Sequence, residues 1–252
     1  MRREAGEALL GLCRDRLVDP SDLAACAGTV LDTWRRAIER VKPFQREVVQ
    51  LEWLLDFDYE GLSAEAGELL QMLGYLQGPE VIRALREALE LTDPHLKCYA
   101  VVSLLRRSEP ISPKEIETVA ASHLVRITLW ENLQALGTEA LMPPRWALPS
   151  ALAASALSRW LSHSNEMGAP PEDIELMDTI RVKKEGDVFL FRFRAYPQPW
   201  KPGAGWKAGI AGPYRNGKAL DSPWSSLRDW DSLTPKEHFE MLYYRGESRG
   251  TA

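Results

Sequence analysis

Three common signatures are missing from this 252-residue sequence: paired cysteines, long apolar runs and the motifs of frequent enzyme families. The three cysteines, Cys13, Cys26 and Cys98, are an odd number without a CxxC pair, which argues against a disulfide framework and fits a reducing cytoplasm. No window approaches the roughly 18 apolar residues that span a bilayer, and the first residues contain no apolar run of signal-peptide length. We therefore expect a cytoplasmic protein that does not enter a membrane.

Residues with catalytic or metal-binding potential are few and scattered. The sequence has no GxSxG, P-loop or GxGxxG motif, and its four histidines form no HxH or HExxH pair. His163 and Glu166 would supply two ligands, but a metal site needs three or four, so a polar helix end is the better interpretation. Asp56, Asp58 and Glu60 lack the later glutamate of a calcium-binding loop and read as a solvated acidic loop. We predict no catalysis, no cofactor and no metal.

Charge is divided unevenly along the chain. Residues 1–180 contain 18 Lys and Arg against 28 Asp and Glu, whereas residues 181–252 contain 13 against 8. Phosphate contacts dominate nucleic-acid affinity, so an acidic body disfavours nucleic acid as the partner. It favours a basic protein partner through complementary potentials. The simpler interpretation is that the acidity only keeps the protein soluble.

The first two thirds of the chain show the apolar spacing of helices. One predicted helical face consists of Val30, Leu31, Trp34, Ile38 and Val41. Further helices are predicted over 62–76 and from Pro79, Pro94 and Ser112 onwards, and a later one over 152–161. Asp93 is a predicted N-cap, and Ser112 with Glu115 forms a predicted capping box.

A weak internal repeat runs through these helices. The phrase Asp93–Ala100 returns as Ser122–Leu129, and Met72–Gly74 returns as Ala135–Gly137. Repeated units of this kind bury their apolar faces by stacking into a solenoid. The phrases Leu73-Gly74, Pro79–Ile82 and Asp93–Ala100 resemble HEAT repeats of the short bacterial type. This resemblance implies a HEAT-like α-solenoid that binds other macromolecules, and it carries no catalytic residue.

The pattern changes to period two after Pro170-Pro171. Residues 175–182 and 187–195 are predicted to form an antiparallel hairpin, and 206–212 a third short strand in which Gly209 and Gly212 mark bulges or close approach. Thr234 to Glu237 is a strong helix start. The fold class is thus mainly α: a HEAT-like solenoid over 1–165, then a small α+β module over 166–252 with a hairpin or three-stranded sheet. Residues 160–214 are similar to a C-terminal module found behind HEAT repeats in poorly characterised bacterial proteins, some of them in toxin–immunity or defence settings.

Tryptophan, tyrosine and arginine, the residues typical of binding hot spots, gather in the C-terminal module. Three interpretations are open: a core of aromatic rings, a protein-binding surface, or a site for nucleic acid or carbohydrate. The candidate partner-binding residues are Arg192, Arg194, Trp200, Trp206, Tyr214, Trp224 and Trp230.

Three functions remain open. The preferred one is a non-enzymatic bacterial protein–protein interaction protein, in its sharpest version an immunity protein whose acidic solenoid blocks a basic toxin or enzyme. The second is a HEAT-like DNA glycosylase acting on alkylated DNA, which requires a basic groove and an aspartate beside tryptophans. The third is a bilin lyase-like enzyme, which only the repeat supports.

Overall fold

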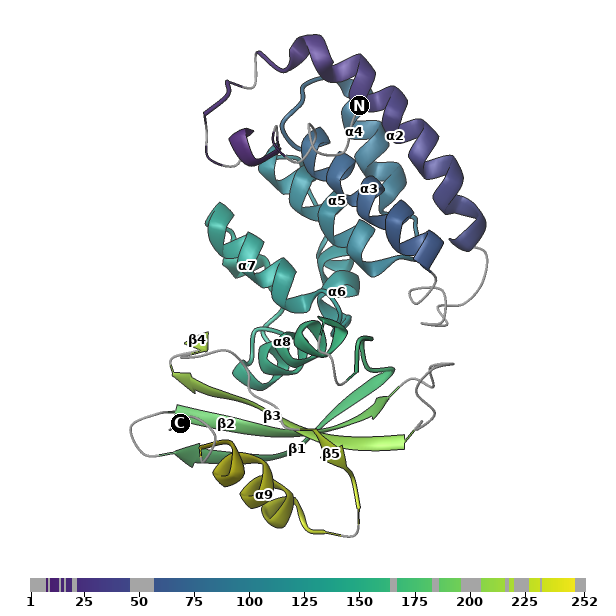
Figure 1. Cartoon of the computed structure of the whole chain (residues 1–252). Coiled ribbons are helices and arrows are strands. Elements are labelled where there is room, and N and C mark those ends of the chain that lie inside the picture. Colours follow the sequence, from purple (N-terminus) through teal and green to yellow (C-terminus); the bar gives the residue numbers. More distant parts are fainter. Residues whose placement is uncertain are drawn as a thin grey trace. The chain divides into compact units, whose positions relative to one another are not determined.

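The chain forms two compact units in the computed structural model (Figure 1). The structure describes residues 8, 10–13, 15, 17–19, 22–45, 57–163, 167–182, 186–195, 205–215, 218–219, 227–231 and 233–247. The helical unit comprises residues 1–120 and 128–142, and the sheet unit comprises 121–127 and 143–252. Each is described by itself.

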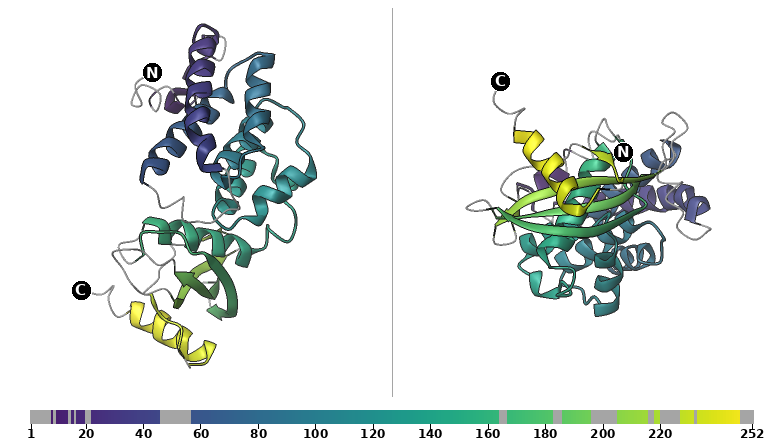
Figure 2. Two further views of the ribbon diagram at one scale, coloured as in Figure 1. Left: turned by 90° about the vertical axis from the view of Figure 1, so that its right-hand side faces the viewer. Right: turned by 90° about the horizontal axis from the view of Figure 1, so that it is seen from below.

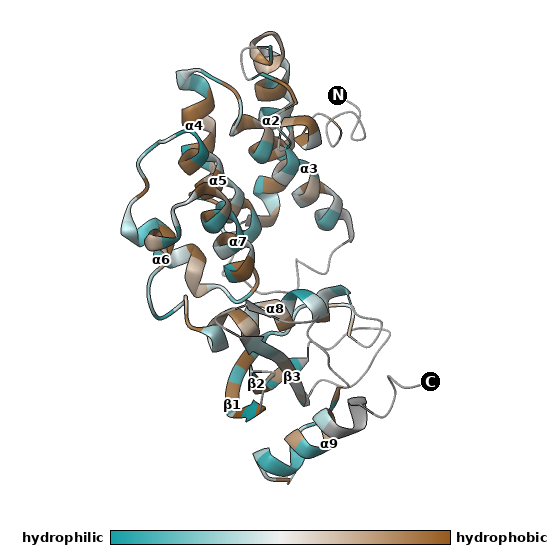
Figure 3. Cartoon of the chain, turned by 90° about the vertical axis from the view of Figure 1, so that its left-hand side faces the viewer, coloured by the Kyte–Doolittle hydropathy of each residue, from teal (hydrophilic) through white to brown (hydrophobic). Residues whose placement is uncertain are grey.

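Helices α2 (Ala27–Val41), α3 (Phe57–Leu73), α4 (Pro79–Ala88) and α5 (Pro94–Arg106) share one apolar core in the helical unit. The predicted inner face of α2 is confirmed, because Val30, Trp34 and Val41 are buried. Hydrophobic and hydrophilic residues alternate along these helices (Figure 3), as expected for elements with one buried face. The helices α6 (Pro113–Ala121) and α7 (Arg126–Leu136) and the 3₁₀ helices η1 (Ala24–Cys26), η2 (Lys42–Gln45) and η4 (Glu139–Leu141) complete the helical part.

The predicted helix starts are present. Ser112 N donates to Glu115 Oε2 over 2.6 Å, and Glu115 N donates to Ser112 Oγ over 3.2 Å, which is a complete capping box. Asp93 Oδ1 accepts hydrogen bonds from the backbone N–H of His95 at 2.7 Å and of Leu96 at 3.3 Å. These bonds satisfy donors that the first turn of a helix leaves unpaired.

Asp93 also joins α5 to α3, which its role as an N-cap did not predict. Its Oδ2 accepts from Tyr59 Oη at 2.6 Å and from Ser63 Oγ at 2.8 Å, and the aspartate is 0% exposed. Burial alone would raise the pKa of this carboxyl group, but the side chain of His95, through its hydrogen bond and its charge, and the hydroxyl groups of Tyr59 and Ser63 outweigh burial and lower the pKa. Asp93 is therefore a buried carboxylate that holds two helices together.

One predicted loop is helical instead. Asp58 and Glu60 lie in the first turn of α3, and Asp56 is outside the described residues. Acidic residues are favourable near a helix N-terminus, where the macrodipole is positive, so the same residues suit a helix start. The interpretation as a loop is therefore wrong for Asp58 and Glu60.

The sheet unit is a twisted antiparallel sheet with a helix on each face. Strands β1 (Asp173–Val182), β2 (Gly186–Ala195) and β3 (Gly205–Arg215) are neighbours in that order, and the two-residue strands β4 (Lys218–Ala219) and β5 (Arg228–Asp229) pair with opposite ends of β3. The predicted hairpin and third strand are confirmed. The sequence did not predict β4 and β5, because two residues carry no periodicity.

Alternation along β2 decides what each face of the sheet carries. Phe189, Phe191 and Phe193 share a core with Leu157 and Leu161 of α8 (Pro149–His163). The opposite face, with Val188 and Leu190, packs against Phe239 and Leu242 of α9 (Pro235–Glu247), and Figure 2 shows α9 lying across the strands. The predicted close approach at Gly212 is also real: its φ is +127°, and a Cβ there would lie 2.8 Å from Asp187 O.

The division of the chain differs from the one expected from the sequence. The sequence places residues 149–163 in the solenoid, but α8 packs on the sheet and belongs to the sheet unit. A helix with an apolar stripe is stable against either a helix or a sheet, and its sequence does not distinguish the two. Among the described helices, none has the length and apolarity needed to cross a membrane.

Candidate functional site

Arg192 and two tryptophans gather on the α9 face of the sheet, at the end that carries the predicted partner-binding residues. Arg192 on β2 is in register with Glu175 on β1, and its Nη2 donates to Glu175 Oε2 over 2.5 Å. Its guanidinium carbon lies 4.4 Å from the ring centre of Trp206 and 5.8 Å from that of Trp230. Cation–π attraction at such distances is worth about 0.5–2 kcal/mol. We call Arg192, Trp206 and Trp230 the aromatic patch.

The structure brings these three predicted residues together from β2, β3 and the segment after β5. Trp206 and Trp230 are half-buried, and the backbone N–H of Trp230 donates to the backbone oxygen of Trp206 over 2.8 Å. Arg194 lies on the same strand face and donates from Nε to Glu172 Oε2 over 2.6 Å, with 48% of its side chain exposed.

The remaining predicted residues are elsewhere. Tyr214 is 5% exposed and packs 5.7 Å from the ring of Phe189, in the core beneath α8. The core interpretation of the aromatic residues therefore holds for Tyr214, because its position on β3 points it at α8. Trp200 and Trp224 lie outside the described residues, so their assignment as partner-binding residues stays a prediction.

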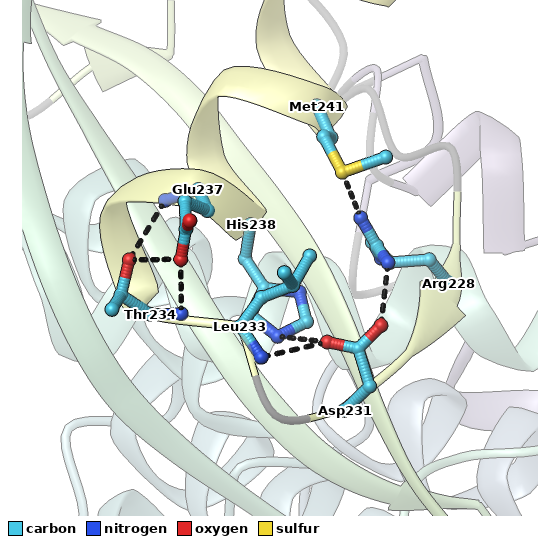
Figure 4. A network of polar contacts seen from close by, with 7 residues as sticks. All are labelled: Arg228, Asp231, Leu233, Thr234, Glu237, His238 and Met241. Carbon is cyan, nitrogen blue, oxygen red and sulfur yellow. Dashed lines mark hydrogen bonds and ion pairs between the residues drawn. The ribbon is translucent and has the colours of Figure 1, made fainter.

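Figure 4 shows a polar network at the start of α9, and this network meets the aromatic patch where His238 stacks on Trp230. Thr234 N donates to Glu237 Oε2 over 2.8 Å, and Glu237 N donates to Thr234 Oγ1 over 3.3 Å, so the predicted capping box is confirmed. Asp231 accepts from Arg228 Nη2 at 2.7 Å and from Leu233 N at 3.0 Å. The bond from Leu233 is the main cause that lowers the pKa of Asp231.

His238 lies inside this network. Its ring is 0% exposed and stacks on Trp230, with 4.4 Å between ring centres and 7° between planes. Nε2 lies 3.3 Å from Asp231 Oδ1, but neither ring nitrogen meets hydrogen-bond geometry with any described residue. Burial is the largest cause that lowers the pKa of His238, and the charge of Arg228 lowers it further, whereas the charge and backbone of Asp231 and the charge of Glu237 act in the opposite direction. A fully buried imidazole cannot touch a substrate, so His238 has a structural part in this site.

Sequence reasoning missed His238, Asp231 and Glu175. The capping residues Thr234 and Glu237 were recognisable because their spacing is local. The contact between His238 and Trp230 requires the end of β5 to meet α9, and the pairing of Glu175 with Arg192 requires the strand register. Opposite charges at predicted facing positions of the hairpin were the one available signal.

The helical unit contributes a second candidate surface at the C-terminal end of α4. Glu87 lies in the last turn and Glu90 follows the helix, and both are exposed. The helix macrodipole is negative at this end, so two carboxylates there add to an already negative potential. Arg86 of the same turn is directed to Glu115 Oε1 at 3.5 Å. This acidic end of α4, Glu87 with Glu90, is suited to receive cationic groups.

The described part of the chain contains no group of three or more His, Cys, Asp or Glu side chains placed to hold an ion. The aromatic patch offers stacking and paired charge to a ligand, and the acidic end of α4 offers a negative potential. Neither arrangement places a nucleophile beside a base.

No protein-family model, no curated protein and no solved structure matches this chain.

Proposed function

We propose that this protein is a non-enzymatic interaction protein whose acidic helical unit binds a basic protein partner. Its sharpest version is an immunity-type inhibitor that covers the basic cleft of a toxin or enzyme, on helices arranged as a HEAT-like solenoid. The observation that carries the proposal is the acidic end of α4, where the negative charges of Glu87 and Glu90 add to the negative end of the helix dipole. Two carboxylates at this end destabilise their own helix. A basic partner that neutralises Glu87 and Glu90 would account for their position.

The charge balance of the helical unit supports this proposal. Residues 22–45, 59–120 and 128–142 contain 15 Asp and Glu against 10 Lys and Arg. Cations of this unit are engaged between its own helices: Arg35 lies 3.2 Å from Glu80, and Arg40 lies 3.2 Å from Glu65. These exposed pairs add little stability. They do reduce the positive potential that would repel a basic partner.

The aromatic patch is proposed as a further contact for a protein partner. Tryptophan and arginine dominate binding hot spots, and Trp206 and Trp230 keep part of their rings accessible while Arg192 holds them in place. The acids Glu175 and Glu172 already pair with Arg192 and Arg194. This patch is therefore closer to neutral than the sequence suggests, which favours a protein surface over a phosphate backbone.

The two enzymatic alternatives gain no specific observation. An acidic helical unit repels DNA, and the buried aspartate of the helical unit, Asp93, is occupied by four donors. A bilin lyase-like activity rests on the repeat alone.

Affinity capture from the native cell extract tests the proposal. The tagged full-length protein, the variant Glu87→Lys/Glu90→Lys and the control Asp22→Lys/Glu139→Lys are compared at low and high salt, with mass spectrometry of the retained proteins. The control makes the same charge change at exposed acids elsewhere in the helical unit. We expect one stoichiometric basic protein with the parent and the control, released by salt, and none with the α4 variant.

Stability separates lost binding from lost folding. Lysines suit a helix C-terminus better than glutamates, so the α4 variant should unfold at the same or a higher temperature than the parent. Equal capture by all three proteins would show that the acidic end of α4 is not the contact. Recovery of nucleic acid, or of no specific protein, would overturn the proposal itself.

A further inference from the structure

Packing against the sheet maintains α9. A 13-residue helix is marginal in water by itself. Here Phe239 and Leu242 pack on an apolar sheet surface that consists of Val188, Leu190, Ala208 and Ile210. The start of the helix is secured by the Thr234–Glu237 capping box and by the buried ring of His238. Any change at His238 therefore acts on the attachment of the whole helix.

The surroundings of the His238 side chain favour its neutral form over its protonated form. The ring is fully buried against Trp230, and neither nitrogen meets hydrogen-bond geometry with a described group. Arg228 of β5, 22% exposed, brings one cation into the same network, and the N-terminus of α9 adds the positive end of its dipole. A proton on His238 would place a second cation there.

The nearby acids are already engaged. Asp231, in the segment after β5, accepts bonds from Arg228 and from Leu233 N, and Glu237 of α9 is held by Thr234. On the sheet side, Arg192 of β2 lies 5.8 Å from the ring centre of Trp230 and pairs with Glu175 of β1. Only Asp231 lies within ion-pair distance of the histidine ring, at 3.3 Å, among the residues that the structure describes. Its charge is shared and compensates a buried imidazolium incompletely.

We propose that His238 is a proton-sensitive latch, whose protonation releases the first turns of α9 and uncovers the apolar sheet surface beneath them. Burial lowers the pKa of His238 below its ordinary value of 6.5, which is the direction that the latch requires. A lowered pKa in the docked state means that attachment is complete above pH 6.5 and weakens as the pH falls below it. Each unit of lowering corresponds to about a tenfold change in the docking equilibrium. The inference does not depend on the proposed partner.

Proton NMR and amide hydrogen exchange on the full chain test the latch together. The His238 ring resonance is titrated from pH 8 to 5, and exchange of the amides of residues 239–243 is measured at the same pH values, corrected for intrinsic rates. We expect His238 to titrate below 6.5 and the protection of α9 to fall in the same interval, by about tenfold for each pH unit by which the pKa is lowered. The amides of β2, which lie in the centre of the sheet, should keep their protection.

The variant His238→Phe supplies the matched control, because phenylalanine keeps a planar ring on Trp230 and has no proton to gain. Protection of α9 in this variant should be independent of pH. An equal loss of protection in His238→Phe would overturn the latch, and so would titration of His238 at or above 6.5. If His238→Phe does not fold, the measurements on the parent protein are sufficient. The latch is then overturned if the hydrogen-exchange protection of α9 does not change over the pH interval in which His238 titrates.

Discussion

Replacement of Asp93 by alanine should be among the most damaging single changes in the helical unit. The aspartate is fully buried, caps α5 and accepts the hydroxyl groups of Tyr59 and Ser63 from α3. Asp93→Ala removes all four bonds at once. Asp93→Asn keeps one oxygen for the backbone donors, but its amide nitrogen cannot accept from the two hydroxyls.

The expected size of the effect is set by these contacts. Loss of an N-cap costs about 0.5–2 kcal/mol. A buried hydroxyl that loses its acceptor costs about 1–3 kcal/mol. We therefore expect Asp93→Ala to lower the free energy of unfolding by about 3–6 kcal/mol, and Asp93→Asn by about half as much. Typical domains have only about 5–15 kcal/mol in total, so the alanine variant should be barely folded at 37 °C.

Urea unfolding followed by circular dichroism measures the global effect, and hydrogen exchange of α3 and α5 locates it. Exposed Asp32→Ala is the control and should change stability little. The lowered pKa adds a second readout: the stability that Asp93 supplies is present above its ordinary pKa of 3.8 and is lost as pH falls further. Asp93→Asn should lack this acid-dependent part. An alanine variant within 1 kcal/mol of the parent would refute the reasoning, since that is less than one lost acceptor is worth, about 1–3 kcal/mol.

Local geometry supports three further predictions. In Gly61→Ala of α3 the new Cβ meets open space, so this variant should raise the free energy of unfolding by about 1 kcal/mol. In Gly67→Ala of the same helix the new Cβ would lie 2.9 Å from the Tyr99 ring, so this variant should gain less or lose stability in urea titrations. Thr234→Ala should lower the exchange protection of α9 without changing that of β2, because it removes the cap of that helix alone. His123 donates from Nε2 to Pro171 O at 3.0 Å, and burial lowers the pKa of His123 below 6.5. Its neutral form therefore stabilises the sheet unit above pH 6.5, and this stability is lost as the pH falls. In thermal melts between pH 7.5 and 5, His123→Gln should lose less stability than the parent.

Local signals in the sequence were sufficient for much of the secondary structure. The caps at Asp93, Ser112 and Thr234 were predicted, because the donor and acceptor of each bond lie within four residues of one another. The period-two pattern predicted β2, and in the structure Phe189, Phe191 and Phe193 lie in one core while Val188 and Leu190 lie in another. Strand periodicity alone is enough for such an assignment.

Of the candidate site, the sequence supplied the residue types and the strands that carry several of them. It identified Arg192, Arg194 and the aromatic residues without showing which were accessible. Tyr214 and Trp206 lie on the same strand, β3, yet one is in the core under α8 and the other is half-buried beside Arg192. The register shift between β2 and β3 after Ala211 interrupts the alternation, so the two side chains lie on opposite faces of the sheet, which different helices cover.

Helix starts, strand alternation and the acidic character of the helical unit are readable from the order of the amino acids, because each depends on composition or on residues a few positions apart. Three other features appear only once the chain has folded: α8 packs on the sheet, Asp93 joins α5 to α3, and His238 is buried against Trp230. All three bring together segments that are distant in the sequence. Apolar burial is non-directional, so a stripe of leucines or an aromatic ring does not specify its partner until the chain has brought distant segments together.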